Sequence, residues 1–128
     1  MLVAGSKGVW PVVDRSDIAQ AMIAAYNAQD VDTYVSYMTD VACEANYRGD
    51  VVREGKEGTR SGLAAAFARW PENHAEIVHT QAVGDFVVMR EYVTRGPATD
   101  GSPLVDPFEV VAVYSFEGDK VSRVEFIR

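Results

Sequence analysis

The sequence predicts one α+β domain in which helices pack on one face of a strongly bent, mixed or antiparallel sheet. The chain has 128 residues, of which 48% are apolar and 24% charged, and this is enough to bury one hydrophobic core. Helical periodicity is concentrated before Pro71, whereas Val-rich alternating segments with short turns fill the remainder. Short turns imply antiparallel neighbours, and helices gathered before a sheet are typical of the α+β class.

Residues 1–13 are predicted to form an arm ahead of a domain that occupies residues 14–128. The first helix is expected after Asp14 and Ser16, because short polar side chains can accept hydrogen bonds from the free N–H groups of a first helical turn. Apolar residues then follow at helical spacing: Ile18, Met22, Ala25 and Tyr26. This stripe indicates a helix that packs one face on the sheet.

Two more helices and six strands complete the predicted order. A short helix is expected between Asp32 and Asp40, and a longer one between Gly55 and Trp70, which Pro71 ends because its ring cannot continue a helix. Strands are predicted where Val, Phe, Tyr and Thr are frequent between Gly and Asp turns. These strands are 41–47, 51–53, 74–82, 85–94, 107–116 and 120–128.

The charge balance argues against two classes of partner. The chain has 12 Lys and Arg against 19 Asp and Glu, a formal net charge of −7. Binding to nucleic acid or to an anionic membrane surface needs clustered cations, but the basic residues here are scattered singly. We therefore expect neither nucleic acid nor a membrane as a partner.

Cysteine and histidine usage sets further expectations. Cys43 is the only cysteine, so no intrachain disulfide can form, which fits a reducing compartment. Residues 1–13 lack the apolar run of a signal peptide, and the predicted location is cytoplasmic. Two histidines and one cysteine without metal-ligand spacing, and no glycine loop of the phosphate-binding kind, predict no metal and no cofactor.

Several motifs, taken in order, resemble a known superfamily. They are Tyr26–Asp32, Met38–Asp40, Arg60–Gly62, Gly84–Val88, Val113–Val121 and Arg123–Phe126. Together they resemble the nuclear-transport-factor-2-like superfamily, most closely its SnoaL-like and ketosteroid-isomerase-like branch. The resemblance covers residues 14–128. It implies a cone-shaped α+β barrel whose bent sheet wraps around a deep apolar pocket, and a homodimer formed through the outer sheet face.

The resemblance also implies positions for the ketosteroid isomerase residues, and this chain lacks them. The family's tyrosine falls at Met22, its carboxylate base at Asn46 and its second donor at Ala112. An amide cannot accept a proton at neutral pH, and the other two side chains cannot donate one. We therefore do not expect ketosteroid isomerisation by that machinery.

This chain also lacks the catalytic residues of the epoxide hydrolase branch. Its Arg and Asp pair would fall at Tyr92 and Thr94, or at Glu91 and Val93 after a one-residue slip, and its other Asp would fall near Phe126. Neither alignment supplies the two carboxylates and the arginine, so water activation in that style is not expected.

Strand alternation selects the candidate site residues. In residues 85–94 it places Arg90 and Tyr92 on one face and Glu91 on the other, and the resemblance makes the first face concave. Arg90 and Tyr26 are then candidates to polarise a carbonyl, with Tyr92 or His79 as the proton carrier. The remaining predicted pocket residues are Met22, Asn46, Phe67, Trp70, Val88, Val110, Ala112 and Phe126.

Each candidate also has a purely structural interpretation. Arg90 can bridge to Glu76 or Asp40 while the tyrosines pack with satisfied hydroxyls, because buried charges are often structural. His79 can be a satisfied packing residue. Cys43 is interpreted as a small buried hydrophobe, since a nucleophilic thiol needs an adjacent base.

Two functions from different classes remain open at this point. The first is a cofactor-independent isomerase, cyclase or dehydratase that acts by enolisation on a hydrophobic carbonyl compound in a SnoaL-like pocket. The alternative is a non-catalytic ligand-binding or dimeric scaffold protein that kept the cone without the catalytic carboxylates.

Overall fold

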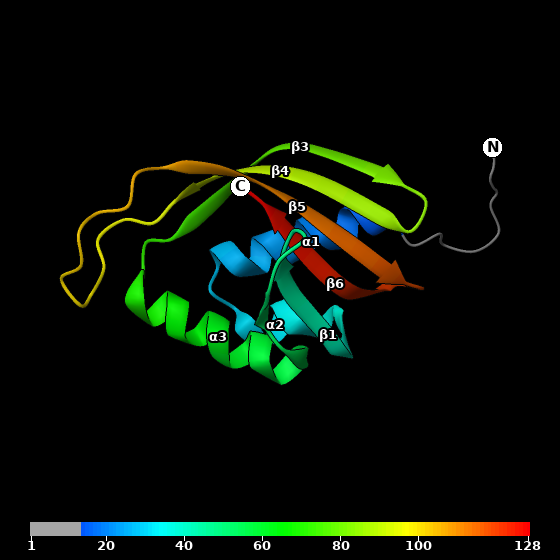
Figure 1. The fold of residues 1–128 in the computed structure, drawn as a ribbon, viewed down its shortest axis with the longest axis horizontal. Helices are drawn as coiled ribbons and strands as arrows, with labels where there is room; N and C mark the ends of the chain where they lie inside the picture. The colour runs from blue at the N-terminus through cyan, green and yellow to red at the C-terminus, as the bar shows by residue number, and fades with distance from the viewer. Residues whose placement is uncertain (1–13) are drawn as a thin grey trace.

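A computed structural model describes residues 14–128 as three helices packed on a six-stranded sheet (Figure 1). The helices are α1 (Arg15–Asn27), α2 (Val31–Ser36) and α3 (Gly55–Arg69). The strands are β1 (Met38–Asn46), β2 (Val51–Arg53), β3 (His74–Val83), β4 (Phe86–Thr94), β5 (Phe108–Glu117) and β6 (Lys120–Ile127). The predicted α+β class is confirmed, and the predicted arm at residues 1–13 lies outside the described residues.

The sheet is mixed and curved. Its strand order is β2-β1-β6-β5-β4-β3, and every neighbouring pair is antiparallel except β1 with β6, which is parallel. In Figure 1 strands β3, β4 and β5 arch over α1, while α3 runs along the open side near β1. The sheet does not close on itself, so its concave face and the helices form a cone-like shell around the interior.

Local capping explains where the first two helices begin. The Asp14 carboxylate accepts a hydrogen bond from the Ser16 N–H at 2.9 Å, and the Asp30 carboxylate accepts one from the Thr33 N–H at 3.1 Å. Helix α2 ends earlier than predicted, at Ser36 and not near Asp40. Its continuation is already strand β1, which pairs with β6 from a distant part of the chain.

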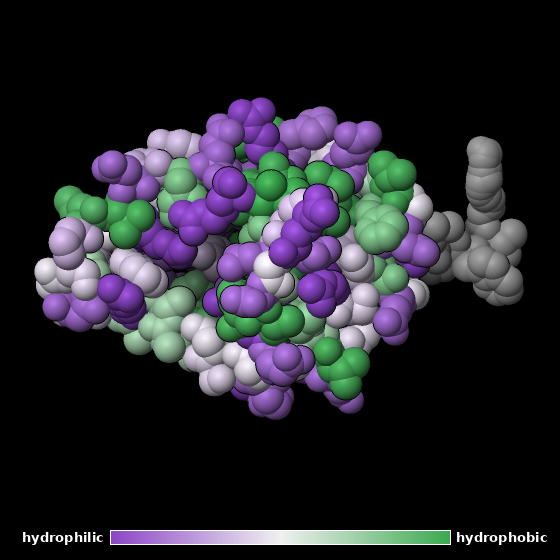
Figure 2. All heavy atoms as spheres, viewed as in Figure 1, coloured by the Kyte–Doolittle hydropathy of each residue, from purple (hydrophilic) through white to green (hydrophobic). Residues whose placement is uncertain are grey.

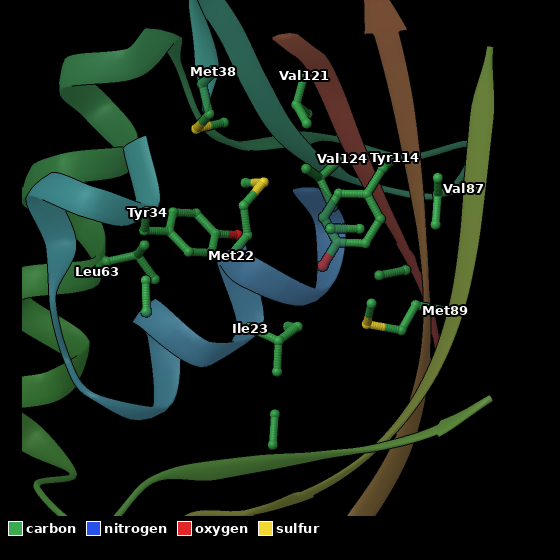
Figure 3. Packing of buried hydrophobic residues seen from close by; sticks show 14 of the residues in the cluster. Met22, Ile23, Tyr34, Met38, Leu63, Val87, Met89, Tyr114, Val121 and Val124 are labelled. Carbon is green, nitrogen blue, oxygen red and sulfur yellow. The ribbon is translucent and has the colours of Figure 1, made fainter. Parts of the chain in front are cut away.

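The core lies between α1 and the concave face. Met22, Met89, Tyr114 and Val124 are fully or almost fully buried, and Figure 3 shows Met22 of α1 directed toward the sheet residues. Burial of each such side chain contributes about 1.5–3 kcal/mol. None of the helices in residues 14–128 is long and apolar enough to span a membrane.

The predicted faces are right for β5 and wrong for β4. Val110, Ala112 and Tyr114 of β5 are buried as predicted. In β4, however, the buried residues are Val87, Met89, Glu91 and Val93. Directly opposite residues of antiparallel strands share a face, and Met89 is opposite Ala112 while Glu91 is opposite Val110. The aliphatic residues of β4 therefore determine which alternate side chains face the core, and Glu91 belongs to that set.

Candidate functional site

A cavity of about 280 Å³ opens between the concave face and the helices. Its apolar lining includes Ile23, Leu63, Trp70, Val93, Val110 and Phe126. Three phenols and four charged side chains also reach it, so the cavity is more polar than the resemblance implied. The phenols are Tyr26, Tyr34 and Tyr114, and the charged residues are Arg53, Glu91, Arg95 and Arg128.

Glu91 is the most unusual of these residues. Its side chain leaves the inner face of β4, the residue is 5% exposed, and its Oε2 has no hydrogen-bond partner among residues 14–128. Burial raises the pKa of Glu91 to about 7, and the nearby Glu44 charge adds to the rise. Near neutral pH this carboxyl group can therefore both accept and release a proton.

Glu44 of β1 is also buried, but it is fully partnered. Its Oε2 accepts a hydrogen bond from the Tyr34 hydroxyl at 2.6 Å, and its Oε1 accepts one from Arg53 Nε at 2.6 Å. Burial, followed by the Glu44 charge, raises the pKa of Tyr34 well above its usual value. Glu44 thus fixes the positions of a protonated phenol and a guanidinium, both of which line the cavity.

Tyr114 of β5 lies close enough to both carboxyl groups for their charges to act on its pKa. It is 1% exposed, and burial, followed by the charges of Glu91, Glu44 and Tyr26, raises its pKa well above the usual value. Its phenol is therefore protonated at neutral pH and can donate a hydrogen bond. Figure 3 shows the Tyr34 and Tyr114 hydroxyl groups directed toward the interior around Met22, which is the space that α1 shares with the sheet.

Tyr26 of α1 accepts two hydrogen bonds at its hydroxyl oxygen. Its oxygen lies 2.5 Å from Asn73 Nδ2 and 3.5 Å from Arg95 Nη1, and both of these groups are donors. Arg95 Nη1 also donates to Asn73 Oδ1 at 2.9 Å, which fixes the orientation of the amide. Because the Tyr26 oxygen accepts these bonds, its own O–H can point to a ligand in the cavity.

Three of the four predicted catalytic residues lie away from the cavity. Arg90, Tyr92 and His79 are exposed on the outer face of the sheet, where His79 is opposite Arg90 in the ladder. Arg90 Nη2 lies 2.9 Å from Glu109 Oε1. The prediction that the Arg90 guanidinium points into the cavity is wrong. The alternative partners Glu76 and Asp40 are also wrong, because Arg90 forms its salt bridge with Glu109 of the adjacent strand β5.

The other predicted pocket residues divide into three groups. Tyr26, Asn46, Trp70, Val110 and Phe126 line the cavity. Met22, Phe67 and Ala112 are buried in the core next to it, and Val88 lies on the outer face of β4.

Cys43 is buried, and its Sγ accepts a hydrogen bond from Arg123 Nη1 at 3.2 Å. In residues 14–128 no group of three or more His, Cys, Asp or Glu side chains is placed to hold a metal ion.

Sequence reasoning missed Glu91 and Arg95, which line the cavity, and Glu44, which holds two of its lining residues in place. One signal was available for Glu91: Val87, Met89 and Val93 alternate with it and are all aliphatic, which argues for the inward phase. No comparable signal marks Glu44 or Arg95, because their partners come from other elements.

Comparison with known proteins identifies the family. Residues 19–124 match the model of the SnoaL-like domain, so the chain belongs to the SnoaL-like domain family. It is similar, with 82% identity and a TM-score of 0.90, to an uncharacterized cystatin fold protein from Novosphingobium aromaticivorans, over 91% of this chain and 100% of that one. A search of curated proteins found no match.

More distant structures share the fold. A candidate polyketide cyclase from Sinorhizobium meliloti is 18% identical, with a TM-score of 0.71 over 87% of this chain and 94% of that one. A LEH-like epoxide hydrolase from M. tuberculosis is also 18% identical, with a TM-score of 0.71 over 88% of this chain and 80% of that one. At such identities the likeness extends to the fold and no further, so the chemistry must be argued from this chain's own side chains.

Proposed function

We propose that the protein is a cofactor-independent enzyme that moves a proton on a small hydrophobic carbonyl compound, with Glu91 as the proton carrier. One observation carries the proposal: a buried carboxyl group lines the cavity, and one of its oxygens has no hydrogen-bond partner in the part of the chain that the structure describes. Leaving a buried polar atom without a hydrogen bond costs about 1–3 kcal/mol. A group kept at such a cost beside a cavity is a strong candidate for a role in chemistry.

The proton affinity of this carboxyl group suits the task. A general base works best when its pKa is close to the working pH, and burial raises the pKa of Glu91 to about 7. The ionised carboxylate can take a proton from the carbon next to a carbonyl group. The resulting carboxylic acid can return it to a different carbon, which is isomerisation, or to a departing oxygen, which is dehydration.

The phenols supply the second requirement, which is to stabilise the enolate oxygen. The Tyr26 hydroxyl accepts bonds from Asn73 and Arg95, so its proton is available to the ligand. Tyr114 is held protonated by its buried surroundings, and it lies close enough to both Glu91 and Tyr26 for their charges to act on its pKa. Donors placed in a buried site where negative charge develops lower the barrier to enolisation.

The alternative is that the cavity binds its ligand without transforming it. The observation that favours this alternative is that the ketosteroid isomerase positions, occupied here by Met22, Asn46 and Ala112, carry no group that can give or take a proton at neutral pH. The same cavity would then store or carry a hydrophobic molecule.

Deuterium exchange distinguishes the two functions. The wild-type protein is incubated in D₂O with a panel of small aryl ketones and aryl 1,3-diketones, and loss of the α-proton is followed by NMR. Proton transfer by a positioned side chain contributes about 10²–10⁴-fold, so Glu91→Gln is expected to lose at least about 100-fold of the exchange rate. Glu109→Gln is the matched control, because Glu109 lies half-exposed on the outer face, and its rate is expected to be unchanged.

The outcomes separate cleanly. Exchange that persists at the wild-type rate in Glu91→Gln contradicts the role of Glu91. Binding of the panel without any exchange favours the non-catalytic alternative.

We also propose that two copies pair through the outer sheet face. Phe86, Val88 and Tyr92 of β4 and Val111 and Val113 of β5 leave apolar surface there, and an apolar sheet face is a common contact surface. On the face of the molecule that Figure 2 shows, hydrophobic residues lie interspersed among hydrophilic ones. Light scattering after gel filtration is expected to give twice the 14.0 kDa of one chain.

A further inference from the structure

Two arginines and two aromatic rings meet where the cavity opens to solvent. Arg95 follows the last residue of β4, and its guanidinium lies 4.8 Å from the centre of the Trp70 ring and 5.3 Å from that of Phe108. The Arg128 guanidinium lies 4.0 Å from the centre of the same Phe108 ring. All four residues line the cavity. The rings therefore hold two like charges close together by cation–π contact.

Neither cation has an acidic partner in residues 14–128. Arg15, Arg53, Arg60, Arg69, Arg90 and Arg123 each form a salt bridge, whereas Arg48, Arg95 and Arg128 form none within that part of the chain, and of these three Arg95 and Arg128 line the cavity. The contrast is notable in a chain whose net charge is −7, because acidic side chains are plentiful. Two cations without an acidic partner in that part of the chain thus lie on the same Phe108 ring of the cavity lining, a pattern that attracts anions.

Arg69 shows that the aromatic contact alone does not explain this lack of a partner. Its guanidinium lies 4.4 Å from the centre of the Trp70 ring, which is closer than that of Arg95. Yet Arg69 pairs with Asp100 at 3.0 Å and does not line the cavity. Of the two arginines on this ring, Arg69 therefore has an acidic partner, whereas Arg95, which lines the cavity, has none within residues 14–128.

Arg95 keeps hydrogen-bonding capacity for a ligand. Its hydrogen bonds within residues 14–128 come from Nη1 alone, to Asn73 and Tyr26. A guanidinium has five N–H donors in a fixed plane, and a carboxylate can accept two of them side by side. Such charge-assisted bonds are about twice as strong as neutral ones.

We infer that the ligand is an aromatic carboxylate, and that Arg95, supported by Arg128, binds its carboxylate group at the opening of the cavity. This inference rests on the proposed function for the statement that the ligand is also the substrate. Arg95 and Glu91 are four residues apart, which corresponds to about 13 Å between Cα atoms on an extended chain. Val93 lies between them on the same face, beside Val110 and Phe108 of β5.

This spacing defines the shape of the ligand. With its carboxylate at Arg95, the ring of the ligand lies over Val93, and the far end reaches Glu91. Ligand cavities commonly span about 300–1,000 Å³, and this one, at about 280 Å³, is at the small end. One or two fused or linked rings match it, and a larger polycyclic skeleton does not.

The test uses matched charged and neutral probes. Binding of benzoate, phenylacetate and 2-naphthoate, and of the corresponding three amides, is measured by isothermal titration calorimetry. The wild-type protein is expected to bind at least one carboxylate at least tenfold more tightly than its amide. Arg95→Met is expected to weaken carboxylate binding by at least tenfold and to leave amide binding within twofold, because the methionine keeps the apolar stem without the charge.

Arg69→Met is the matched control. It removes a guanidinium from the same Trp70 ring but outside the cavity, so carboxylate binding is expected to stay within twofold of wild type. Arg128→Met is expected to have a smaller effect than Arg95→Met, because Arg128 is the more exposed of the two. Retained amide binding in each variant shows that the cavity is intact.

Three results overturn the inference: amides that bind as tightly as carboxylates, carboxylate binding that is indifferent to Arg95→Met, or a panel in which no carboxylate binds. These results are independent of Glu91. Glu91→Gln is expected to retain carboxylate binding while losing deuterium exchange, so failure of the proposed chemistry and failure of the proposed ligand class give different patterns.

Discussion

Two buried carboxyl groups on the same concave face have opposite surroundings. Glu44 of β1 is 0% exposed, and each of its oxygens accepts a hydrogen bond, one from Tyr34 and one from Arg53. Glu91 of β4 is 5% exposed, and none of the described residues, 14–128, gives its Oε2 a hydrogen-bond partner. Both are acids in a low-dielectric interior, so burial alone does not distinguish them. The difference is in what the neighbouring elements offer.

The contrast indicates a structural role for Glu44 and a role in proton transfer for Glu91. The partners of Glu44 offset the loss of its hydration, and the result is a fixed network at one side of the cavity. Glu91 has no such compensation, so its proton affinity rises, and the cavity gives a ligand access to it. A site that moves a proton requires an uncompensated carboxyl group such as Glu91. The hydrogen-bonded network of Glu44 keeps the surrounding side chains in fixed positions.

The largest expected effect on stability comes from removing Glu44, the carboxyl group that has hydrogen-bond partners. Glu44→Ala leaves Arg53 and the Tyr34 hydroxyl without their acceptor, and removing one partner of a buried ion pair costs about 3–5 kcal/mol. Urea denaturation at pH 7 measures this loss of unfolding free energy. Glu44→Gln keeps the shape and one acceptor oxygen, so its loss is expected to be smaller. A loss below about 1 kcal/mol in Glu44→Ala would contradict the view that the network is structural.

The next effect has the opposite sign. Because the pKa of Glu91 is raised from 4.5 to about 7 in the folded protein, the native state holds this proton longer than the unfolded state. The group's contribution to stability is therefore fully present below pH 4.5 and is lost as the pH rises to about 7. The lost contribution is about 3 kcal/mol, since one pKa unit corresponds to about 1.4 kcal/mol.

Glu91→Gln tests this sign. The variant carries no titrating group at this position, so it is expected to be more stable than wild type at pH 8 by up to about 3 kcal/mol and similar to it at pH 4. The difference between the two urea curves at each pH cancels the other titrating groups. A variant that is less stable than wild type at pH 8 would show that Glu91 has a stabilising partner in solution.

A smaller effect sharpens the comparison at the level of the phenols. Tyr34→Phe removes the hydroxyl that donates to Glu44, and hydrogen bonds to charged groups contribute about 1.5–3 kcal/mol. Compared with Tyr34→Phe, Tyr114→Phe is expected to lose less unfolding free energy and to show a larger fall in the rate of deuterium exchange. The reason is that the Tyr114 hydroxyl lies at the cavity, near Glu91, Glu44 and Tyr26. Equal effects of both variants on exchange would remove the distinction between the two sides of the cavity.

Local patterns were sufficient for most of the fold. Helix α3 and strands β3 to β6 begin and end within a residue or two of their predicted bounds, because Pro71 and the Gly and Asp turns mark their ends in the sequence itself. The end of α2 was misplaced by several residues. There the backbone pairs with β6, more than eighty residues away in the chain, and no local signal announces that partner.

The site was harder to predict than the fold for the same physical reason. Tyr26, Trp70 and Phe126 reach the cavity because their apolar stripes already fixed their faces. The resemblance places the face with Arg90 and Tyr92 on the concave side, and strand alternation then turns Glu91 outward. Only the register with β5 shows that its aliphatic neighbours place it inside, and only the three-dimensional arrangement shows that its Oε2 has no partner among residues 14–128.

The smallest expected effect lies on the opposite face of the same strand. Arg90 and Glu109 pair at 2.9 Å with about half of each side chain exposed, and such surface pairs contribute about 0–1 kcal/mol. Arg90→Met is therefore expected to change the unfolding free energy by less than about 1 kcal/mol and to leave deuterium exchange unchanged. Salt is expected to weaken the pair further, because exposed charges are screened. A loss of exchange in Arg90→Met would mean that the outer face acts on the cavity through a second copy of the chain, and the light-scattering mass of the same variant would decide that point.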